Sequence, residues 1–513
     1  MQMRYNHQTR ANRLKMKFLK LLLYLLVSSF LQGCISDDAS IELNDDILGL
    51  IVFKSELKDP SSNLQSWKED DNSPCSWKFI QCNPINGRVS HVSLDGLGLS
   101  GKIGTRGLRK LQHLKVLSLS HNDFTGNINP ELGLIASLER LNFSHNSLSG
   151  QIPPSLLNLN MMNMKFLDLS NNLLSGPVPY QLFENCASLR YLSLAGNILQ
   201  GPIGKIFNYC SSLNTLNLSN NHFSGDLDFA SGHGIWSLKR LRTLDLSHNL
   251  FSGSIPQGVA ALHYLKELLL QGNQFSGPLP ADIGFCPHLT TLDLSNNLFT
   301  GQLPVSLRLL NSMIFISVSN NTLTGDIPHW IGNISTLEFL DFSNNHLTGS
   351  LPLSLFNCKK LSVIRLRGNS LNGNIPEGLF DLGLEEIDLS ENGFMGSIPP
   401  GSSSSSSSTL FQTLRILDLS SNNLVGDIPG EMGLFANLRY LNLSSNHLRS
   451  RIPPELGYFH NLIHLDLRNN ALYGSIPQEV CESRSLGILQ LDGNSLTGPI
   501  PQELGNCTSL YLL

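Results

Sequence analysis

The chain has 513 residues, of which 15% are charged, and its formal net charge is −5. Six basic residues precede the first acidic one, and without them the remainder would carry −5 − 6 = −11. Because nucleic-acid binding needs a basic face, this composition argues against a nucleic-acid partner.

The first element is an apolar run close to the N-terminus. Residues 18–27 (FLKLLLYLLV) follow a basic stretch and precede small and polar residues. The run is too short for a typical membrane span but is typical of a secretory leader. We therefore predict a signal peptide at residues 1–33, with a signal anchor or a lipoprotein-type leader ending at Cys34 as alternatives.

An N-terminal cap is predicted at residues 42–83. Ile47 to Leu57 reads as an apolar helix, and the Asn and Asp residues just before it are candidate N-caps. Trp67 and the sequence PCSW at 74–77 follow, and then Cys82. A stack of repeats needs its end shielded from water, which such a cap would provide.

Residues 88–513 repeat the pattern L-x-x-L-x-L-x-x-N-x-L-x-G-x-I-P, and residues 289–304 give one complete copy. Most steps between repeats are 24 residues long. The asparagines that recur once in each copy are Asn122, Asn146, Asn172, Asn197, Asn221, Asn249, Asn273, Asn297, Asn321, Asn345, Asn369, Asn392, Asn422, Asn446, Asn470 and Asn494. Repetition on this scale predicts a solenoid.

The repeat has a physical explanation. Each L-x-L segment predicts a short strand with its leucines inward, and one coil cannot bury those leucines alone. Stacked coils make a continuous core and a parallel sheet. The asparagine amide can both donate to and accept from backbone groups that turn inward after the strand. We predict that the sixteen asparagines form a buried structural ladder.

The motif L-x-G-x-I-P, as in residues 323–328, resembles the plant-specific leucine-rich repeat. The resemblance implies an α/β repeat solenoid, a right-handed horseshoe with a parallel concave β-sheet, a short second sheet and 3₁₀ helices on the convex side. About 17 repeats are expected. The sequence stops at Leu513 inside a predicted strand, which suggests that the repeats are truncated and belong to a longer protein.

The same resemblance implies that Cys75 and Cys82 form the disulfide of the cap. Five further cysteines each lie three residues before a repeat-opening leucine, a slot that suits a small buried side chain: Cys186, Cys210, Cys286, Cys358 and Cys507. Cys186 and Cys210 occupy this slot in adjacent coils, so a bridge between them remains open. No paired C-x-x-C motif indicates zinc.

Catalytic and cofactor motifs are not evident. Residues 96–101 spell G-x-G-x-x-G, but the segment belongs to the first, degenerate repeat and leads into another turn rather than a helix. Histidines and carboxylates show no triad or metal spacing. We therefore expect no catalytic residue, no metal site and no cofactor in this chain.

Three repeat steps are long: 26 residues from Asn146 to Asn172, 28 from Asn221 to Asn249, and 30 from Asn392 to Asn422. The second contains residues 231–234 (SGHG) and the third a serine run at residues 402–408. For the serine run, a flexible bulge is the simpler interpretation, and a modified or binding loop is the alternative.

The expected concave face carries two recurrent features. An acidic residue lies between the two strand leucines at Asp168, Asp245, Asp293, Asp341, Asp388, Asp418 and Asp466. This stripe is either a solvated polar face or a field that attracts basic ligands. Sequons predict N-glycosylation at Asn142, Asn217, Asn320, Asn333, Asn442 and Asn506. The first, second and fifth of these should point toward the concave side.

One coil breaks the acidic pattern. Arg365 and Arg367 occupy positions where neighbouring coils carry Asp and Ser, and strand alternation should aim both at the concave face. Paired guanidinium groups suit a carboxylate. They form our candidate ligand-binding residues, although Glu385 and Glu386 in the next coil provide a simpler reading as ion-pair partners.

The chain as a whole resembles the ectodomains of plant leucine-rich-repeat receptor-like serine/threonine kinases, and residues 43–82 resemble most the group of the inflorescence and root apices receptor kinase. Some peptide-hormone receptors of this family hold the peptide's terminal carboxylate with an R-x-R pair at the third and fifth positions of L-x-x-L-x-L. Here Arg365 matches the fifth position, but Val363 takes the third and Arg367 the seventh. Carboxylate capture is therefore a hypothesis for this chain.

The resemblance implies an extracellular ligand-recognition domain on the outer side of the plasma membrane. Its expected partners are a peptide or protein ligand and a co-receptor kinase, with membrane attachment through a segment outside this chain. A receptor-like protein without a kinase and a secreted inhibitor of cell-wall-degrading enzymes are the alternatives, and the inhibitor usually has fewer repeats.

Overall fold

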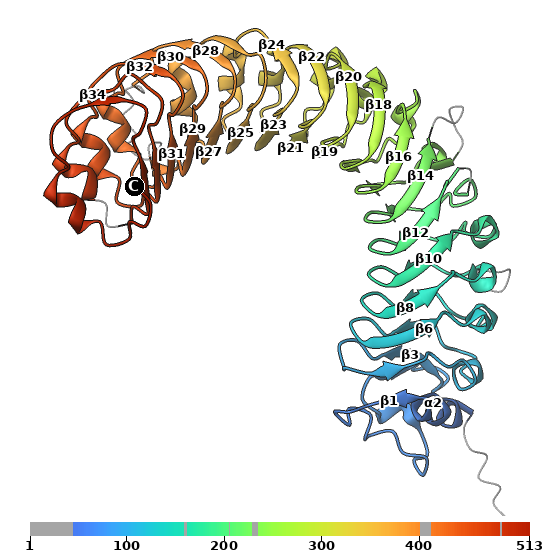
Figure 1. Cartoon of the computed structure of the whole chain (residues 1–513). Helices are drawn as coiled ribbons and strands as arrows, with labels where there is room; N and C mark the ends of the chain where they lie inside the picture. The colour runs from blue at the N-terminus through green and yellow to red at the C-terminus, as the bar shows by residue number, and fades with distance from the viewer. Residues whose placement is uncertain (1–44, 158–161, 205, 228–233, 401–411, 483–484) are drawn as a thin grey trace, which may run out of the picture.

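The computed structural model describes residues 45–157, 162–204, 206–227, 234–400, 412–482 and 485–513. The predicted signal peptide, the serine run and most of the SGHG loop lie outside these residues. The described chain winds into coils that follow a wide arc, with its two ends far apart (Figure 1). Most coils contribute a concave strand, a flanking strand and a convex 3₁₀ helix.

The N-terminal cap begins with helix α2 (Asp45–Ser55), earlier at both ends than predicted. Asp45 and Asp46 lie in its first turn, where carboxylates favour the positive end of a helix. The prediction that the helix reaches Leu57 is wrong. Leu57 instead belongs to strand β1 (Leu57–Lys58), which pairs antiparallel with the first flanking strand.

The concave sheet contains one short strand per coil, and its central residue points into the core. After the antiparallel pair β2–β3, each strand pairs in parallel with the equivalent strand of the next coil. Figure 1 shows the odd-numbered strands from β19 to β31 on the inner side of the arc. The strands are β2 (Ile80–Cys82), β3 (Val89–Ser93), β5 (Val116–Ser118), β7 (Arg140–Asn142), β9 (Phe166–Asp168), β11 (Tyr191–Ser193), β13 (Thr215–Asn217), β15 (Thr243–Asp245), β17 (Glu267–Leu269), β19 (Thr291–Asp293), β21 (Phe315–Ser317), β23 (Phe339–Asp341), β25 (Val363–Arg365), β27 (Glu386–Asp388), β29 (Ile416–Asp418), β31 (Tyr440–Asn442), β33 (His464–Asp466) and β35 (Ile488–Gln490).

A second set of strands lies on the flank and forms three separate sheets. The first sheet runs from β1 to β24, the second from β26 to β32, and the third pairs β34 with β36. The strands after β1 are β4 (Ser100–Gly101), β6 (Asp123–Asn127), β8 (Ser147–Gly150), β10 (Leu173–Pro177), β12 (Ile198–Gly201), β14 (His222–Asp226), β16 (Leu250–Gly253), β18 (Gln274–Pro278), β20 (Leu298–Gly301), β22 (Thr322–Asp326), β24 (His346–Thr348), β26 (Asn372–Asn374), β28 (Gly393–Gly396), β30 (Asn423–Gly426), β32 (His447–Leu448), β34 (Tyr473–Gly474) and β36 (Ser495–Leu496).

Short 3₁₀ helices line the convex side. Most begin directly after a proline, whose fixed φ suits an extended N-cap position. The helices are η1 (Pro74–Ser76), η2 (Leu108–Lys110), η3 (Pro130–Leu134), η4 (Pro154–Leu157), η6 (Tyr180–Phe183), η7 (Gly234–Ser237), η8 (Val259–Ala261), η9 (Ala281–Phe285), η10 (Val305–Leu309), η11 (His329–Asn333), η12 (Leu353–Asn357), η13 (Glu377–Leu382), η15 (Gly430–Leu434), η16 (Pro454–Tyr458), η17 (Gln478–Cys481) and η18 (Gln502–Asn506).

The core is one continuous column of leucines, isoleucines and phenylalanines that runs from the cap to the last coils. The asparagine ladder borders it. Asn297, for example, donates from Nδ2 to the carbonyls of Leu270, Leu294 and Ser295 at 3.0–3.1 Å. Its Oδ1 accepts from the Phe275 N–H at 3.0 Å. The ladder asparagines therefore bind backbone groups of their own coil and of the preceding coil, as the repeat pattern predicts.

The cap closes the first coil with stacked tryptophans and a buried ion pair. The rings of Trp67 and Trp77 lie 5.7 Å apart and nearly parallel. Asp46 is 1% exposed, and both of its oxygens accept from the Arg88 guanidinium at 2.8–2.9 Å. It also accepts from the Val89 N–H, so this carboxylate joins the helix to the first strand of the repeats.

Candidate ligand-binding surface

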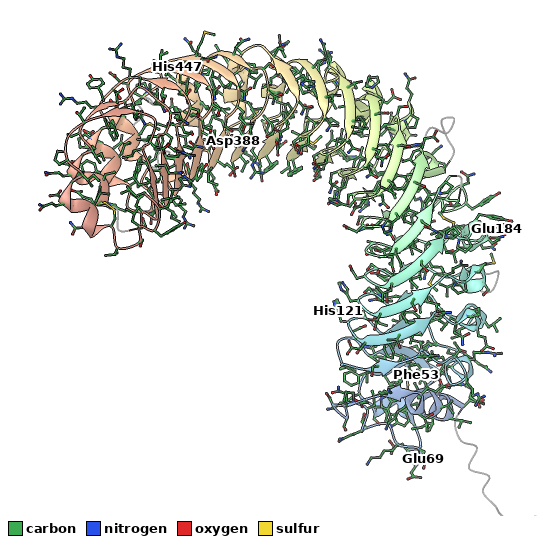
Figure 2. The ribbon with its side chains drawn as sticks, viewed as in Figure 1. Phe53, Glu69, His121, Glu184, Asp388 and His447 are labelled. Carbon is green, nitrogen blue, oxygen red and sulfur yellow. A yellow bond between two sulfur atoms is a disulfide. The ribbon has the colours of Figure 1, made fainter. Side chains whose placement is uncertain are left out.

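The concave face is built from the two residues that flank the buried centre of each short strand. These side chains are mostly half-buried because neighbouring coils crowd them. Figure 2 shows Asp388 and His121 on the inner side of the arc and Glu184 on the outer side. The concave face is therefore the surface on which the sequence places the acidic stripe and the arginines.

The carboxylates of the acidic stripe hold the turns of their own coils through hydrogen bonds, which the sequence pattern does not reveal. Asp293 accepts at Oδ1 from the N–H and the hydroxyl of Ser295, at 3.0 and 2.7 Å. Asp388 binds Ser390 in the same way. Burial raises the pKa of both carboxyl groups despite these hydrogen bonds. One oxygen of each carboxylate thus holds the turn after the strand.

The structure pairs Arg365 with Glu386 of the next coil. The guanidinium donates from Nε and one terminal nitrogen to the two carboxylate oxygens, at 2.6 and 2.9 Å. This hydrogen bonding to Glu386 raises the pKa of Arg365. The Arg365 side chain also lies over the Phe339 ring, 5.3 Å from its centroid. It remains 38% exposed, so a ligand can still reach it.

Arg367 is held by a different carboxylate. Its guanidinium donates to Glu391 at 2.7 Å, and this contact raises its pKa. Glu385, one of the two partners expected from the sequence, instead pairs with Arg415 at 3.5 Å. The two arginines therefore do not share one carboxylate in this structure, and each already has a partner.

Sequence reasoning missed two aromatic pairs on the concave face. The rings of Phe166 and Tyr191 stack at 4.3 Å, and those of Phe315 and Phe339 stack at 4.4 Å. Arg140 covers the first pair, with its guanidinium carbon 3.6 Å from the Phe166 centroid. Aromatic residues at the same repeat position in consecutive coils were the available signal, because that position recurs at the spacing of adjacent strands.

A third cluster lies near the C-terminal end of the sheet. The Tyr440 hydroxyl donates to Asp418 at 3.3 Å, and the Tyr440 ring packs against the edge of His464. Burial raises the pKa of the Tyr440 hydroxyl. The Asn442 amide donates to both Asp418 and the Tyr440 oxygen, at 3.1 and 3.2 Å. The cluster ties three consecutive coils together.

The predicted glycosylation sites fall into two groups. Asn142, Asn217 and Asn442 lie in concave strands, and each accepts at Oδ1 from the serine two residues on. The amide nitrogen of Asn442 is also bonded, as described above. The other three asparagines lie on exposed positions: Asn320, Asn333 and Asn506.

The cysteines form more bridges than expected. Cys75–Cys82 and Cys186–Cys210 are both disulfides, the first expected from the family and the second left open by the sequence. A third bridge, Cys481–Cys507, was not predicted, because Cys481 lies at the end of η17 and outside the recurrent slot. The remaining cysteines of the repeats are buried thiols whose pKa burial raises to about 11: Cys286 and Cys358.

Over the described parts of the chain, no three acidic, histidine or cysteine side chains gather as a metal site would require. Within the same residues, no helix has the length and apolar character needed to cross a bilayer.

Family models match most of this architecture. The leucine rich repeat N-terminal domain matches residues 43–83, a leucine-rich repeat region matches residues 397–513, and a further repeat model matches residues 102–128. Single leucine rich repeats match residues 137–159, 163–185, 212–232, 240–262, 264–286, 288–310, 336–358 and 383–404.

Two curated relatives from Arabidopsis thaliana are receptor kinases by name. A probably inactive leucine-rich repeat receptor-like protein kinase is 54% identical over 274 residues, which are 49% of this chain and 24% of that protein. The probable receptor-like serine/threonine-protein kinase IRK is 58% identical over 90 residues, 18% of this chain and 9% of that protein. The aligned parts thus span about a quarter or less of these relatives.

Solved ectodomains agree over nearly the whole chain. The Arabidopsis receptor kinase HAESA, in complex with the peptide hormone IDA and the co-receptor SERK1, matches with a TM-score of 0.62 and 30% identity. That match covers 92% of this chain and 89% of HAESA's. A TDR receptor matches with a TM-score of 0.65 and 26% identity, covering 82% and 83%. The described coils and cap, which contain no catalytic domain, therefore belong to the family of plant leucine-rich-repeat receptor kinase ectodomains.

Proposed function

We propose that this chain is the extracellular ligand-recognition part of a receptor-like kinase, on the outer side of the plasma membrane. Support comes from HAESA, solved with a peptide hormone and a co-receptor, and from a plant peptide hormone receptor, RGFR1, solved with RGF2. RGFR1 matches with a TM-score of 0.53 at 28% identity. Three disulfides also fit an oxidising, extracellular setting.

The ligand on this proposal is a peptide or a protein segment that binds the concave face around β21, β23 and β25. The observation that carries it is the column of Phe315, Phe339 and Arg365, in which two stacked rings end under a half-exposed guanidinium. Aromatic and arginine side chains dominate binding energy at protein interfaces. Among the described coils, no other stacked pair of aromatic rings adjoins an arginine that forms a bidentate ion pair with a carboxylate.

In this structure Glu386 occupies the place on Arg365 that the ligand's carboxylate would take. A terminal carboxyl group would exchange with Glu386 on Arg365, so the gain in affinity is the difference between two similar ion pairs. Arg367 is ion-paired with Glu391 and is more exposed than Arg365. It would attract the ligand's carboxylate at a distance rather than form a preformed binding site for it. Specificity then rests mainly on what the rings contact.

A co-receptor ectodomain is the second proposed partner, by likeness to HAESA, which is solved with SERK1. The two chains would contact the same bound ligand, so that ligand and co-receptor stabilise each other's binding. In a binding assay, the affinity for the ligand should rise when a co-receptor ectodomain is added.

The test is titration calorimetry of the purified chain against a panel of synthetic secreted peptides, each made with a free and an amidated C-terminus. A peptide that binds should lose at least about tenfold in affinity on R365A/R367A, because its carboxylate would then lie beside Glu386 and Glu391 without their arginines. Amidation should cost less, since the gain from the carboxylate is only the difference between two similar ion pairs. R415A is the control, since Arg415 is also ion-paired and is more exposed than Arg365 and Arg367. If wild type and R365A/R367A bind the peptide with equal affinity, the two arginines are not part of the binding site.

A further inference from the structure

One lateral edge of the solenoid carries a row of cations. At this edge the chain turns from the convex helices into the concave strands, and the last residue of each turn forms a backbone ladder with its equivalents in neighbouring coils. Lys266 donates to the Arg242 carbonyl, Arg242 to Asn214 and Asn214 to Arg190, at 2.7–2.8 Å. Their side chains therefore leave the solenoid in register, about 4.8 Å apart per coil.

We call Arg190, Lys239, Arg240, Arg242 and Lys266 the basic edge. All five are exposed, and none is in an ion pair within the described residues. The equivalent turn positions from the coil of Arg190 to the coil of Thr290 contain no carboxylate: Ala187, Ser188, Ser211, Ser212, Asn214, His263, Tyr264, Pro287, His288 and Thr290. The edge is thus positive although the whole chain is acidic.

The same ladder shows how a carboxylate fits between two such cations. Two coils before Arg190, Glu139 lies in the row between Lys115 and Lys165, and its carboxylate forms an ion pair with each. Hydrogen bonds from these lysines lower the pKa of Glu139. Asn214 occupies the corresponding place between Arg190 and Arg242. Arg190, Asn214 and Arg242 therefore repeat the arrangement of Lys115, Glu139 and Lys165, except that an asparagine replaces the central carboxylate.

We propose that the basic edge binds an acidic polypeptide segment in extended conformation. Arg190 and Lys266 are three coils apart, about 14 Å, and carboxylates at alternate residues i, i+2 and i+4 of a strand span nearly the same distance. The middle carboxylate then lies about 7 Å along the row from Arg190, between Asn214 and Arg242.

Exposed apolar side chains beside the row favour a polypeptide over a plain polyanion. Tyr264 is 55% exposed, and Phe285 of the next coil is 52% exposed. Large aromatics mixed with arginine are typical of protein-binding surfaces. The surface is separate from the concave face, so the proposal does not depend on peptide capture by Arg365.

The test uses the purified chain and a fluorescent peptide with Asp at three alternate positions, and anisotropy as the readout. N214E is the decisive variant, because it supplies the missing carboxylate from the chain itself and should compete with the peptide. We expect at least a tenfold weaker affinity for N214E and for R190Q/R242Q, and a steep loss of wild-type binding with added salt. S362E is the matched control, since it adds the same charge at the same repeat position outside the row, and should bind like wild type.

Three results would overturn the proposal. One is no binding of the Asp peptide by wild type, and another is an equal loss for N214E and S362E. The third is that oligogalacturonate, a linear acidic polysaccharide, binds more tightly than the peptide and that Y264A leaves both affinities unchanged. That result would assign the basic edge to a polysaccharide instead. Circular dichroism of each variant shows whether the fold is retained.

Discussion

At the scale of single residues, the ladder asparagines stabilise the fold through hydrogen bonds to backbone groups beside the core. Asn297 makes four hydrogen bonds with backbone groups of its own coil and of the preceding coil, and it is buried. An apolar replacement leaves these backbone groups without partners and without water. The cost falls on the backbone groups rather than on the missing side chain.

Asn297→Ala should therefore lower the free energy of unfolding by about 2–3 kcal/mol. Urea denaturation followed by circular dichroism measures the change. Asn296→Gly is the control, because Asn296 is exposed and has a φ of 55°, which glycine adopts without strain. If the two variants lose the same stability, the ladder does not have the role assigned to it.

The acidic stripe gives a prediction with a pH dependence. Burial raises the pKa of Asp293, and the charge of Asp341 adds to the effect. The folded chain thus holds this proton more tightly than the unfolded chain. The group's contribution to stability therefore falls as pH rises from below the ordinary aspartate pKa, about 3.9, through the raised folded value.

Asp293→Asn should remove this penalty without loss of hydrogen bonds, because Asn142 and Asn217 bind their serines at the same repeat position. The variant should be about as stable as wild type at pH 3.5 and more stable than wild type at pH 7. Denaturation at both pH values measures this. The protein should come from a host without N-glycosylation, since the change creates a sequon. A variant that is less stable at pH 7 would contradict the argument.

At the scale of elements, the period of the sequence determines most of what the structure contains. The position of each concave strand follows from L-x-L, and the convex turns follow from the prolines. The end of α2 could not be predicted, because Leu57 is apolar enough to continue a helix and its strand partner Gly101 lies far along the sequence. The partners of Arg365 and Arg367 depend on side-chain reach between coils, which spacing alone does not give.

The third disulfide joins the ends of the last two convex helices, and its effect should be confined to the two coils that contain them. Cys481–Cys507 closes a loop of 26 residues, so its removal should cost about 3 kcal/mol in the chain-entropy account. C481A/C507A should lose hydrogen-exchange protection in β33 and β35. Cys358→Ala, which removes a buried thiol that forms no bridge, is the control. Unchanged protection in β33 and β35 would show that packing alone holds these coils.

At the scale of the whole molecule, the arc is a one-dimensional stack in which each coil touches only its neighbours (Figure 1). The buried column is continuous, and the described concave strands pair only with those of neighbouring coils. Such a solenoid provides a long surface on which several sites can coexist. The concave column at Arg365 and the basic edge are two of them, and they lie on different sides of the coils.

The same architecture predicts how far along the chain a destabilising substitution affects local stability. Leu292 is fully buried at the centre of β19, which pairs with β17 and β21. Leu292→Ala should cost about 2–5 kcal/mol, since it leaves a cavity between coils. Because stability in a stack is a sum of nearest-neighbour interfaces, we expect faster amide exchange in β17, β19 and β21. Exchange in β3 and β33 should stay at the wild-type rate. Uniformly faster exchange along the whole chain would mean that the coils unfold together, and it would contradict the one-dimensional description.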